Sequence, residues 1–125
     1  AFPLRSGGRM TRLLPVLADA ALVLLFAFLG RRSHEHGLSL TGLFQTAGPF
    51  LCGTAAGWLL AAGLTDLAPR SVPFGLVVVA ATVVVGMGLR LVFAQGVAWS
   101  FVLVATAVLS VLLLGWRAIA GLVGA

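Results

Sequence analysis

Asp19 is the residue in this chain whose type and position could most readily do chemistry. It is the acidic residue that lies inside a long apolar segment. The segment starts at Leu13, so a helical rise of about 1.5 Å per residue puts Asp19 about 9 Å inside it. A carboxylate in apolar surroundings is costly unless a cation pairs with it or it takes up a proton. Asp19 is therefore expected to be half of a buried ion pair or a proton- or cation-coupled site.

Arg117 is the expected partner of Asp19 in an ion pair. Both residues lie toward the membrane face that carries the chain termini, as do Arg12 and Arg70, whereas Arg90 lies near the opposite face. The long apolar stem of an arginine lets its guanidinium group reach inward from a helix end. An Asp19–Arg117 pair would hold the first and fourth apolar segments together.

The densest polar cluster follows the first apolar segment. Its charged and titratable members are Arg31, Arg32, His34, Glu35 and His36. Arg90 is expected at the same membrane face, where Glu35 could pair with it. Three interpretations stay open: a solvated loop, an anionic lipid headgroup at Arg31 and Arg32, and a metal held by the two histidines and the glutamate. No further metal-binding motif supports the third, so we expect neither metal nor cofactor.

Recognisable catalytic patterns are missing from the sequence. Ser33 and His34 are adjacent, so they cannot face one another as a nucleophile and its base. The sequence also lacks the nucleophile-elbow motif of hydrolases, the zinc-protease motif, the phosphate-binding loop and the dinucleotide-binding motif. The sequence therefore predicts a protein without enzymatic activity.

Four apolar segments must position these side chains. They run roughly over 13–30, 43–64, 73–90 and 98–116, and 61% of the 125 residues are hydrophobic against 9% charged. Each segment is near the length of about 20 residues that a helix needs to cross a bilayer. We predict an all-α integral membrane protein with one four-transmembrane-helix bundle over 13–117. A short basic tail over 1–12 precedes it, and a short Gly-rich tail over 118–125 follows it.

The basic residues are all arginines at the segment ends, and they predict topology. Arginine at a span end anchors the helix at the headgroups, whereas a nucleic-acid binder gathers its cations on one face among aromatic side chains. The net charge of +5 therefore does not predict a nucleic-acid partner. The termini share one side, which carries five arginines against three on the other. This bias favours cytoplasmic termini in the plasma membrane, and it disappears if translation starts at Met10. Trp58, Trp99 and Trp116 are expected to anchor the spans at the headgroups.

Glycines at helical spacing predict where the helices approach one another. Gly53 and Gly57 lie four residues apart in the second segment, and Gly86 and Gly88 lie in the third. Small residues allow close helix contacts in lipid, which supplies no hydrophobic push between helices. The contacts could be within the chain or with a second copy.

A faint internal repeat suggests that the bundle consists of two related two-helix hairpins. At an offset of 58 residues, Pro15 matches Pro73, Gly30 matches Gly88, Arg32 matches Arg90, and Gly57-Trp58 matches Gly115-Trp116. The hairpins would be related by an axis along the membrane normal, and Arg90 would be an interfacial anchor. Chance matches in a chain this rich in Ala, Leu, Val and Gly are the alternative explanation.

Several short motifs resemble those of a known family. They are Asp19, Gly30-Arg31-Arg32-Ser33-His34, Thr46-Ala47-Gly48-Pro49-Phe50, Gly57-Trp58, Gly86-Met87-Gly88-Leu89-Arg90, Ser100-Phe101-Val102 and Leu114-Gly115-Trp116-Arg117. Together they resemble the bacterial and archaeal family known as domain of unknown function 3054, over nearly the whole chain after Met10. The resemblance implies a small four-span protein, here of a bacterial inner membrane, and it implies no activity.

Two functions fit these observations. The first is an accessory or interaction subunit that binds a membrane protein partner or a second copy, because the chain has little extramembrane mass and Gly-rich faces. The second is a small proton- or cation-coupled transporter or channel that uses Asp19. In outline only, such a chain resembles the small multidrug-resistance transporters, so the second function is an analogy.

Overall fold

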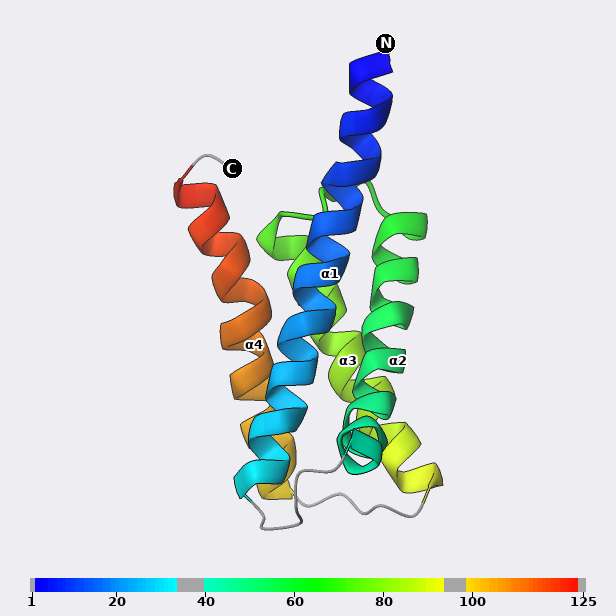
Figure 1. Ribbon diagram of the computed structural model, residues 1–125, viewed down its shortest axis with the longest axis vertical. Helices are drawn as coiled ribbons and strands as arrows, with labels where there is room; N and C mark the ends of the chain where they lie inside the picture. Colours follow the sequence, from blue (N-terminus) through cyan, green and yellow to red (C-terminus); the bar gives the residue numbers. More distant parts are fainter. Residues whose placement is uncertain (1, 34–39, 94–98, 124–125) are drawn as a thin grey trace.

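The computed structural model of the protein is a bundle of four long helices (Figure 1). It describes the backbone of residues 2–33, 40–93 and 99–123, and the side chains of 13–30, 43–93 and 99–123. The helices are α1 (Phe2–Ser33), α2 (Leu40–Leu64), α3 (Val72–Val92) and α4 (Trp99–Leu122). All four are long and apolar enough to span a membrane, and the described residues contain no strand. The predicted all-α, multi-pass architecture is confirmed.

Two of the helices extend by more than one turn beyond the predicted spans. The first turns of α1 are formed by residues expected to be a tail, so Pro15 lies in the middle of the helix. At the other end of the chain, α4 continues past Trp116 to Leu122, where a Gly-rich tail was expected. Arg117 does not end the span because it is directed into the bundle with 1% of its surface exposed. The apolar residues after it then continue the helix.

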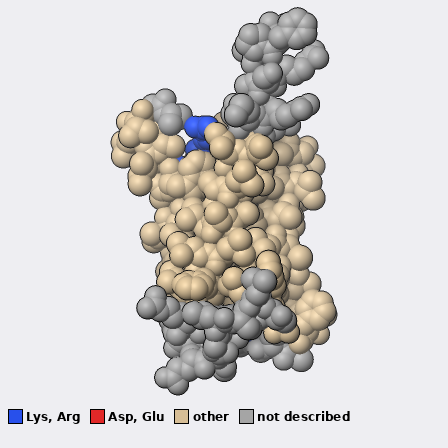
Figure 2. Space-filling model, viewed as in Figure 1, with Lys and Arg blue, Asp and Glu red and all other residues tan. Residues whose placement is uncertain are grey.

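The start of α1, the end of α4 and the α2–α3 connection Thr65–Ser71 lie at the same end of the bundle, which we call the terminus end (Figure 1). Large apolar side chains are exposed on the outside of every helix, for example Leu17, Leu59, Val84 and Val111. The side of the molecule shown in Figure 2 is accordingly almost free of charge between its two ends. An outer surface of this kind suits the hydrocarbon core of a bilayer.

The closest helix contact is between α2 and α3, and glycines make it possible. A Cβ atom on Gly53 would lie 2.7 Å from the Cα atom of Thr82, and one on Gly57 would lie 2.9 Å from the Cα atom of Val78. The two backbones therefore touch directly. Beside this contact, the hydroxyl groups of Thr54 and Thr82 form a buried hydrogen bond of 2.9 Å. Gly53 and Gly57 thus serve a contact within the chain.

Only one of the two glycines expected to pack on α3 does so. A Cβ atom on Gly86 would lie 2.5 Å from the ring of Phe50, so this glycine makes room for an aromatic side chain. Gly88 is exposed, and no heavy atom of a described neighbour lies within 4 Å of where its Cβ would be. Gly88 therefore makes no helix contact within the described part of the chain, and its contact with a second copy stays a prediction. Residues two apart on a helix with 3.6 residues per turn point in nearly opposite directions, so the two glycines cannot serve one contact.

The contact between α4 and α1 is the least extensive one in the bundle. The two helices diverge toward the terminus end (Figure 1). Under the 58-residue offset this contact would be the counterpart of the α2–α3 contact, and Val111 would be the counterpart of Gly53. The side chain of Val111 is 71% exposed. Val111 therefore lies on the outer surface and not at the α1–α4 contact, so the position equivalent to Gly53 serves no helix contact within the chain.

Candidate functional site

The carboxylate of Asp19, on α1, is the centre of a buried polar cluster. Asp19 is fully buried, and its two oxygens accept hydrogen bonds from the guanidinium group of Arg117 on α4. Nη1 donates to Oδ1 at 2.9 Å, and Nη2 donates to Oδ2 at 2.7 Å. A bidentate ion pair of this geometry is among the strongest polar contacts in proteins. The structure therefore brings together the pair of residues that the sequence predicts.

Two tryptophans complete the surroundings of the carboxylate. The indole Nε1 of Trp58 on α2 donates to Oδ2 of Asp19 at 2.8 Å, and that of Trp116 on α4 donates to Oδ1 at 2.9 Å. Each carboxylate oxygen thus accepts one guanidinium and one indole hydrogen bond. A carboxylate has about four lone-pair positions. The acceptor capacity of Asp19 is therefore used by groups of this chain.

The guanidinium group of Arg117 is equally occupied. Its Nε donates to the carbonyl oxygen of Pro69 at 3.0 Å, and its Nη1 also donates to the carbonyl oxygen of Leu113 at 3.0 Å. The guanidinium carbon lies 4.6 Å from the ring of Trp116 and 5.7 Å from the ring centroid of Phe74. Aromatic faces stabilise a cation at such distances, above all away from water. The charge of Arg117 is thus compensated inside the bundle.

The first turn of α3 provides the space that Arg117 occupies. A Cβ atom on Gly75 would lie 2.8 Å from Cδ of Arg117, so a larger residue would collide with the arginine stem. Ser71 caps the helix by accepting a hydrogen bond from the backbone N–H of Phe74 at 3.3 Å. The ring of Phe74 packs edge-on against Trp58, with 4.6 Å between centroids. The start of α3 is thereby fixed against the cluster.

We call Asp19, Trp58, Trp116, Arg117 and the Pro69 carbonyl the charged cluster. It joins α1, α2, α4 and the α2–α3 connection, and it packs against the first turn of α3. Its donors and acceptors are directed at one another, and it presents neither a nucleophile nor an open base. What this arrangement can do chemically is hold four helices in a fixed relation.

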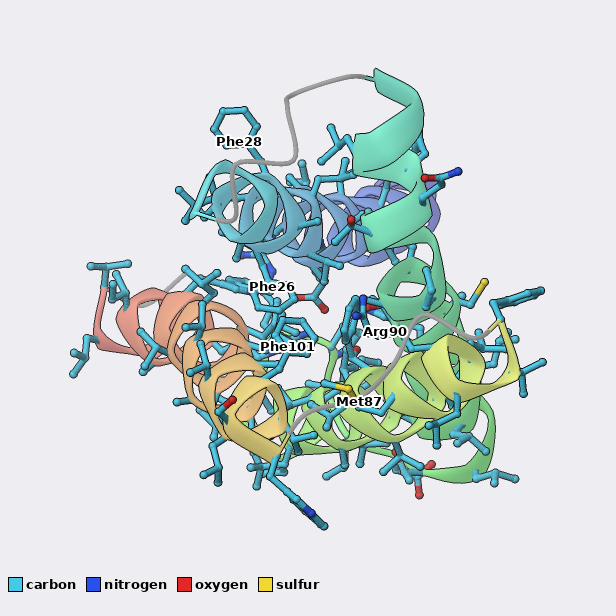
Figure 3. The ribbon with its side chains drawn as sticks, turned by 90° about the horizontal axis from the view of Figure 1, so that it is seen from below. Phe26, Phe28, Met87, Arg90 and Phe101 are labelled. Carbon is cyan, nitrogen blue, oxygen red and sulfur yellow. The ribbon has the colours of Figure 1, made fainter. Side chains whose placement is uncertain are left out.

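Arg90 lies at the opposite end of the bundle, as the sequence predicts, but it is not simply an interfacial anchor. Its guanidinium carbon lies 4.9 Å from the ring centroid of Phe101. Phe101 belongs to an aromatic group with Phe26 and Phe50, whose ring centroids are 5.3 to 6.2 Å apart. In Figure 3, seen from this end, Arg90, Phe26 and Phe101 point into the bundle, whereas Phe28 points outward. Arg90 is thus part of the packing between helices.

The polar cluster that follows the first span lies outside the residues whose side chains are described. This holds for Arg31, Arg32, His34, Glu35 and His36. The lipid site, the metal site and the Glu35–Arg90 pair therefore stay predictions. Among the described side chains, no three His, Cys, Asp or Glu residues are grouped so that they could hold a metal ion.

A comparison with known families identifies the chain. Residues 16–120 match the family described as Protein of unknown function (DUF3054). The chain belongs to this family. No curated protein and no solved structure matches it. The resemblance inferred from the sequence motifs is thus confirmed, and the matched range of DUF3054 contains all four side chains of the charged cluster.

Two members of the charged cluster in this DUF3054 chain were assigned another role from the sequence. Trp58 and Trp116 were expected to anchor spans at the headgroups, and this expectation is wrong because their indole N–H groups bind Asp19. Trp99 is 83% exposed and fits that role. The repeat contained a usable signal, since it makes Trp58 and Trp116 equivalent, and a buried indole requires an acceptor.

Replacing Trp58 by phenylalanine tests the indole hydrogen bond. The phenylalanine would keep most of the apolar ring but lose the donor to Oδ2 of Asp19, so we expect the free energy of unfolding to fall by about 1.5 kcal/mol. Unfolding of the purified chain by titration with sodium dodecyl sulfate would measure the loss. Trp99→Phe is the matched control, for which a change within about 0.5 kcal/mol is expected. Equal effects of the two substitutions would contradict the role assigned to Trp58.

Proposed function

We propose that this protein is a non-enzymatic component of the plasma membrane that acts as an accessory or interaction subunit through contacts within the bilayer. One observation carries the proposal. The charged cluster is the most polar part of the described interior. Its hydrogen bonds are made within the chain, since each carboxylate oxygen of Asp19 accepts two of them. Its geometry supports a role in architecture.

A transport role for Asp19 would require more freedom than this geometry provides. A coupling carboxylate must exchange a proton or a cation with water, whereas Asp19 is 0% exposed. The guanidinium group of Arg117 donates a hydrogen bond to each of the two carboxylate oxygens of Asp19. Releasing Asp19 would break four hydrogen bonds in an apolar setting, where unpaired polar groups are costly.

The outer helix faces are the surface left for an interaction. The described connection at the terminus end, Thr65–Ser71, is short, and the exposed surface of the helices is apolar. A partner would therefore meet this protein within the membrane, as another membrane protein or as a second copy. Cytoplasmic termini, favoured by the arginine bias, belong to the same proposal.

Small proton- or cation-coupled transport is the second candidate, and one observation favours it. The Asp19–Arg117 pair joins α1 and α4, which are the neighbouring helices with the least extensive contact. Separation of these two helices would open the pair to its surroundings. Ionisable residues inside the spans of transporters commonly mark the path of a proton or an ion, and the Asp19–Arg117 pair is such a site.

Purification of the tagged chain from its native membranes in a mild detergent tests the first candidate. We expect native mass spectrometry to show a membrane protein partner or a second copy in fixed stoichiometry, with mock-purified membranes from cells lacking the tag as the control. A monomer without a partner under conditions that preserve known membrane complexes would contradict an accessory role.

Flux measurements in proteoliposomes test the second candidate. We expect no proton or cation flux above empty vesicles for the wild-type chain. Flux that is lost both in Asp19→Asn and in the paired variant Asp19→Leu with Arg117→Met would support transport. The paired variant is informative because it removes both charges together and so leaves no unpaired charge in the bundle.

A further inference from the structure

Arg70 is the other described basic side chain at the terminus end, and its hydrogen bonding is incomplete. It immediately precedes Ser71, the residue that caps α3. Its Nε atom is buried and has no hydrogen-bond partner among the described residues. Buried donors are nearly always paired in native proteins. The Nε atom itself is closed to a ligand, but the residue as a whole is only half-buried, and no hydrogen bond among the described residues uses its guanidinium group. The exposed part of this group can therefore bind an acceptor from outside the chain.

The acceptors closest to Arg70 in sequence are occupied by other donors. The carbonyl oxygen of Pro69 accepts from Arg117. The carbonyl oxygen of Ala68 accepts from the backbone N–H and the hydroxyl group of Ser71. Within the part of the chain that the structure describes, the ion pair found is Asp19–Arg117, so Asp66 does not neutralise Arg70. The positive charge of Arg70 is therefore uncompensated by described groups, whereas that of Arg117 is compensated.

The position of Arg70 is suited to a lipid headgroup. It lies in the short connection between two spans, α2 and α3, and hence at the level where a bilayer presents its phosphates. Below this level, the outer surface is apolar, with Leu17 on α1 and Leu76 on α3 exposed. A ligand with an anionic headgroup and hydrocarbon chains could contact Arg70 and the apolar surface at the same time.

We propose that Arg70 binds the phosphate of an anionic phospholipid in the leaflet at the terminus end. The two Nη groups of a guanidinium present parallel donors to two phosphate oxygens. A phosphodiester would accept hydrogen bonds from the exposed part of the guanidinium group, and the acyl chains would lie along the apolar outer surface. This site is at the opposite end of the bundle from Arg31 and Arg32.

Native mass spectrometry of the full chain with added lipids tests this site. The purified protein in a neutral detergent is offered phosphatidylglycerol or phosphatidylcholine. We expect the wild type to retain phosphatidylglycerol preferentially, and Arg70→Gln to retain it about fivefold less, as expected for the loss of one basic group near a charged headgroup. Arg90→Gln removes the same charge at the opposite end and is the matched control, for which retention close to the wild type is expected.

Three results would overturn the proposal. The first is equal retention of phosphatidylglycerol by the wild type and Arg70→Gln. The second is equal retention of the two lipids by the wild type, which needs no variant and so decides the matter even if Arg70→Gln does not fold. The third is displacement of the lipid by millimolar inorganic phosphate, which would assign the site to free phosphate. Arg70→Lys keeps the charge without the parallel donors, so we expect weaker retention than in the wild type.

Discussion

Replacing Asp19 by asparagine is expected to lower the free energy of unfolding by about 3–5 kcal/mol, the usual cost of removing one partner of a buried ion pair. Arg117, which is 1% exposed, would keep a full charge in the apolar interior without its counter-charge. The amide group would also replace one acceptor oxygen by a donor that faces other donors. Titration with sodium dodecyl sulfate, followed by circular dichroism, would measure the loss.

A paired substitution separates the loss of the ion pair from the presence of an unpaired charge. Asp19→Leu combined with Arg117→Met removes both charges and keeps apolar volume, so we expect it to be less destabilising than Asp19→Asn alone. The control is Asp66→Asn, since Asp66 is exposed and has no ion pair among the described residues. Its effect should stay within about 0.5 kcal/mol. Wild-type stability of Asp19→Asn would show that the pair does not hold the bundle together.

Replacing Gly53 by valine is expected to cost about 3 kcal/mol, the upper part of the range for overpacking a tight contact. A Cβ atom there would lie 2.7 Å from Cα of Thr82 and 2.8 Å from the carbonyl oxygen of Ala81. Both are backbone atoms, so they cannot move aside as a flexible side chain can. The α2–α3 contact would have to widen, and the hydrogen bond between Thr54 and Thr82 would weaken.

The same unfolding titration would measure the effect of Gly53→Val, and α2 contains its own control. Gly63 is exposed, and no described heavy atom lies within 4 Å of its Cβ position. Gly63→Val should therefore change stability little beyond helix propensity, within about 0.5 kcal/mol. If Gly53→Val behaved like Gly63→Val, the close backbone approach of α2 and α3 would be wrong.

The four spans were predictable because hydropathy depends on local sequence alone. A helix in lipid satisfies its own backbone groups, so a run of apolar residues of sufficient length predicts a span without knowledge of its neighbours. Even so, the end of α4 was misplaced. The span was expected to end at Trp116 and Arg117, whereas the helix continues to Leu122 because the guanidinium group of Arg117 is directed into the bundle. Where a charged side chain points depends on whether a partner lies nearby in space.

The Asp19–Arg117 pair was predictable from charge and topology. A lone carboxylate in a span needs a cation, and the number of spans places Arg117 on the same side of the membrane. Its surroundings were not predictable in this way. The indoles of Trp58 and Trp116 come from α2 and α4, and their direction depends on how these helices are rotated about their axes in the bundle.

Rotation about the helix axis also decided which glycines matter. The sequence alone determined the membrane class, the four spans and the need of Asp19 for a partner, because these follow from the cost of polar groups in lipid. Only the tertiary structure decided that Gly53 and Gly86 lie at contacts within the chain and that Gly88 does not. It also decided that Arg117 is compensated while the buried Nε of Arg70 is not. The rotation of each helix about its own axis is set by packing against neighbouring helices, and this packing is a property of the whole bundle.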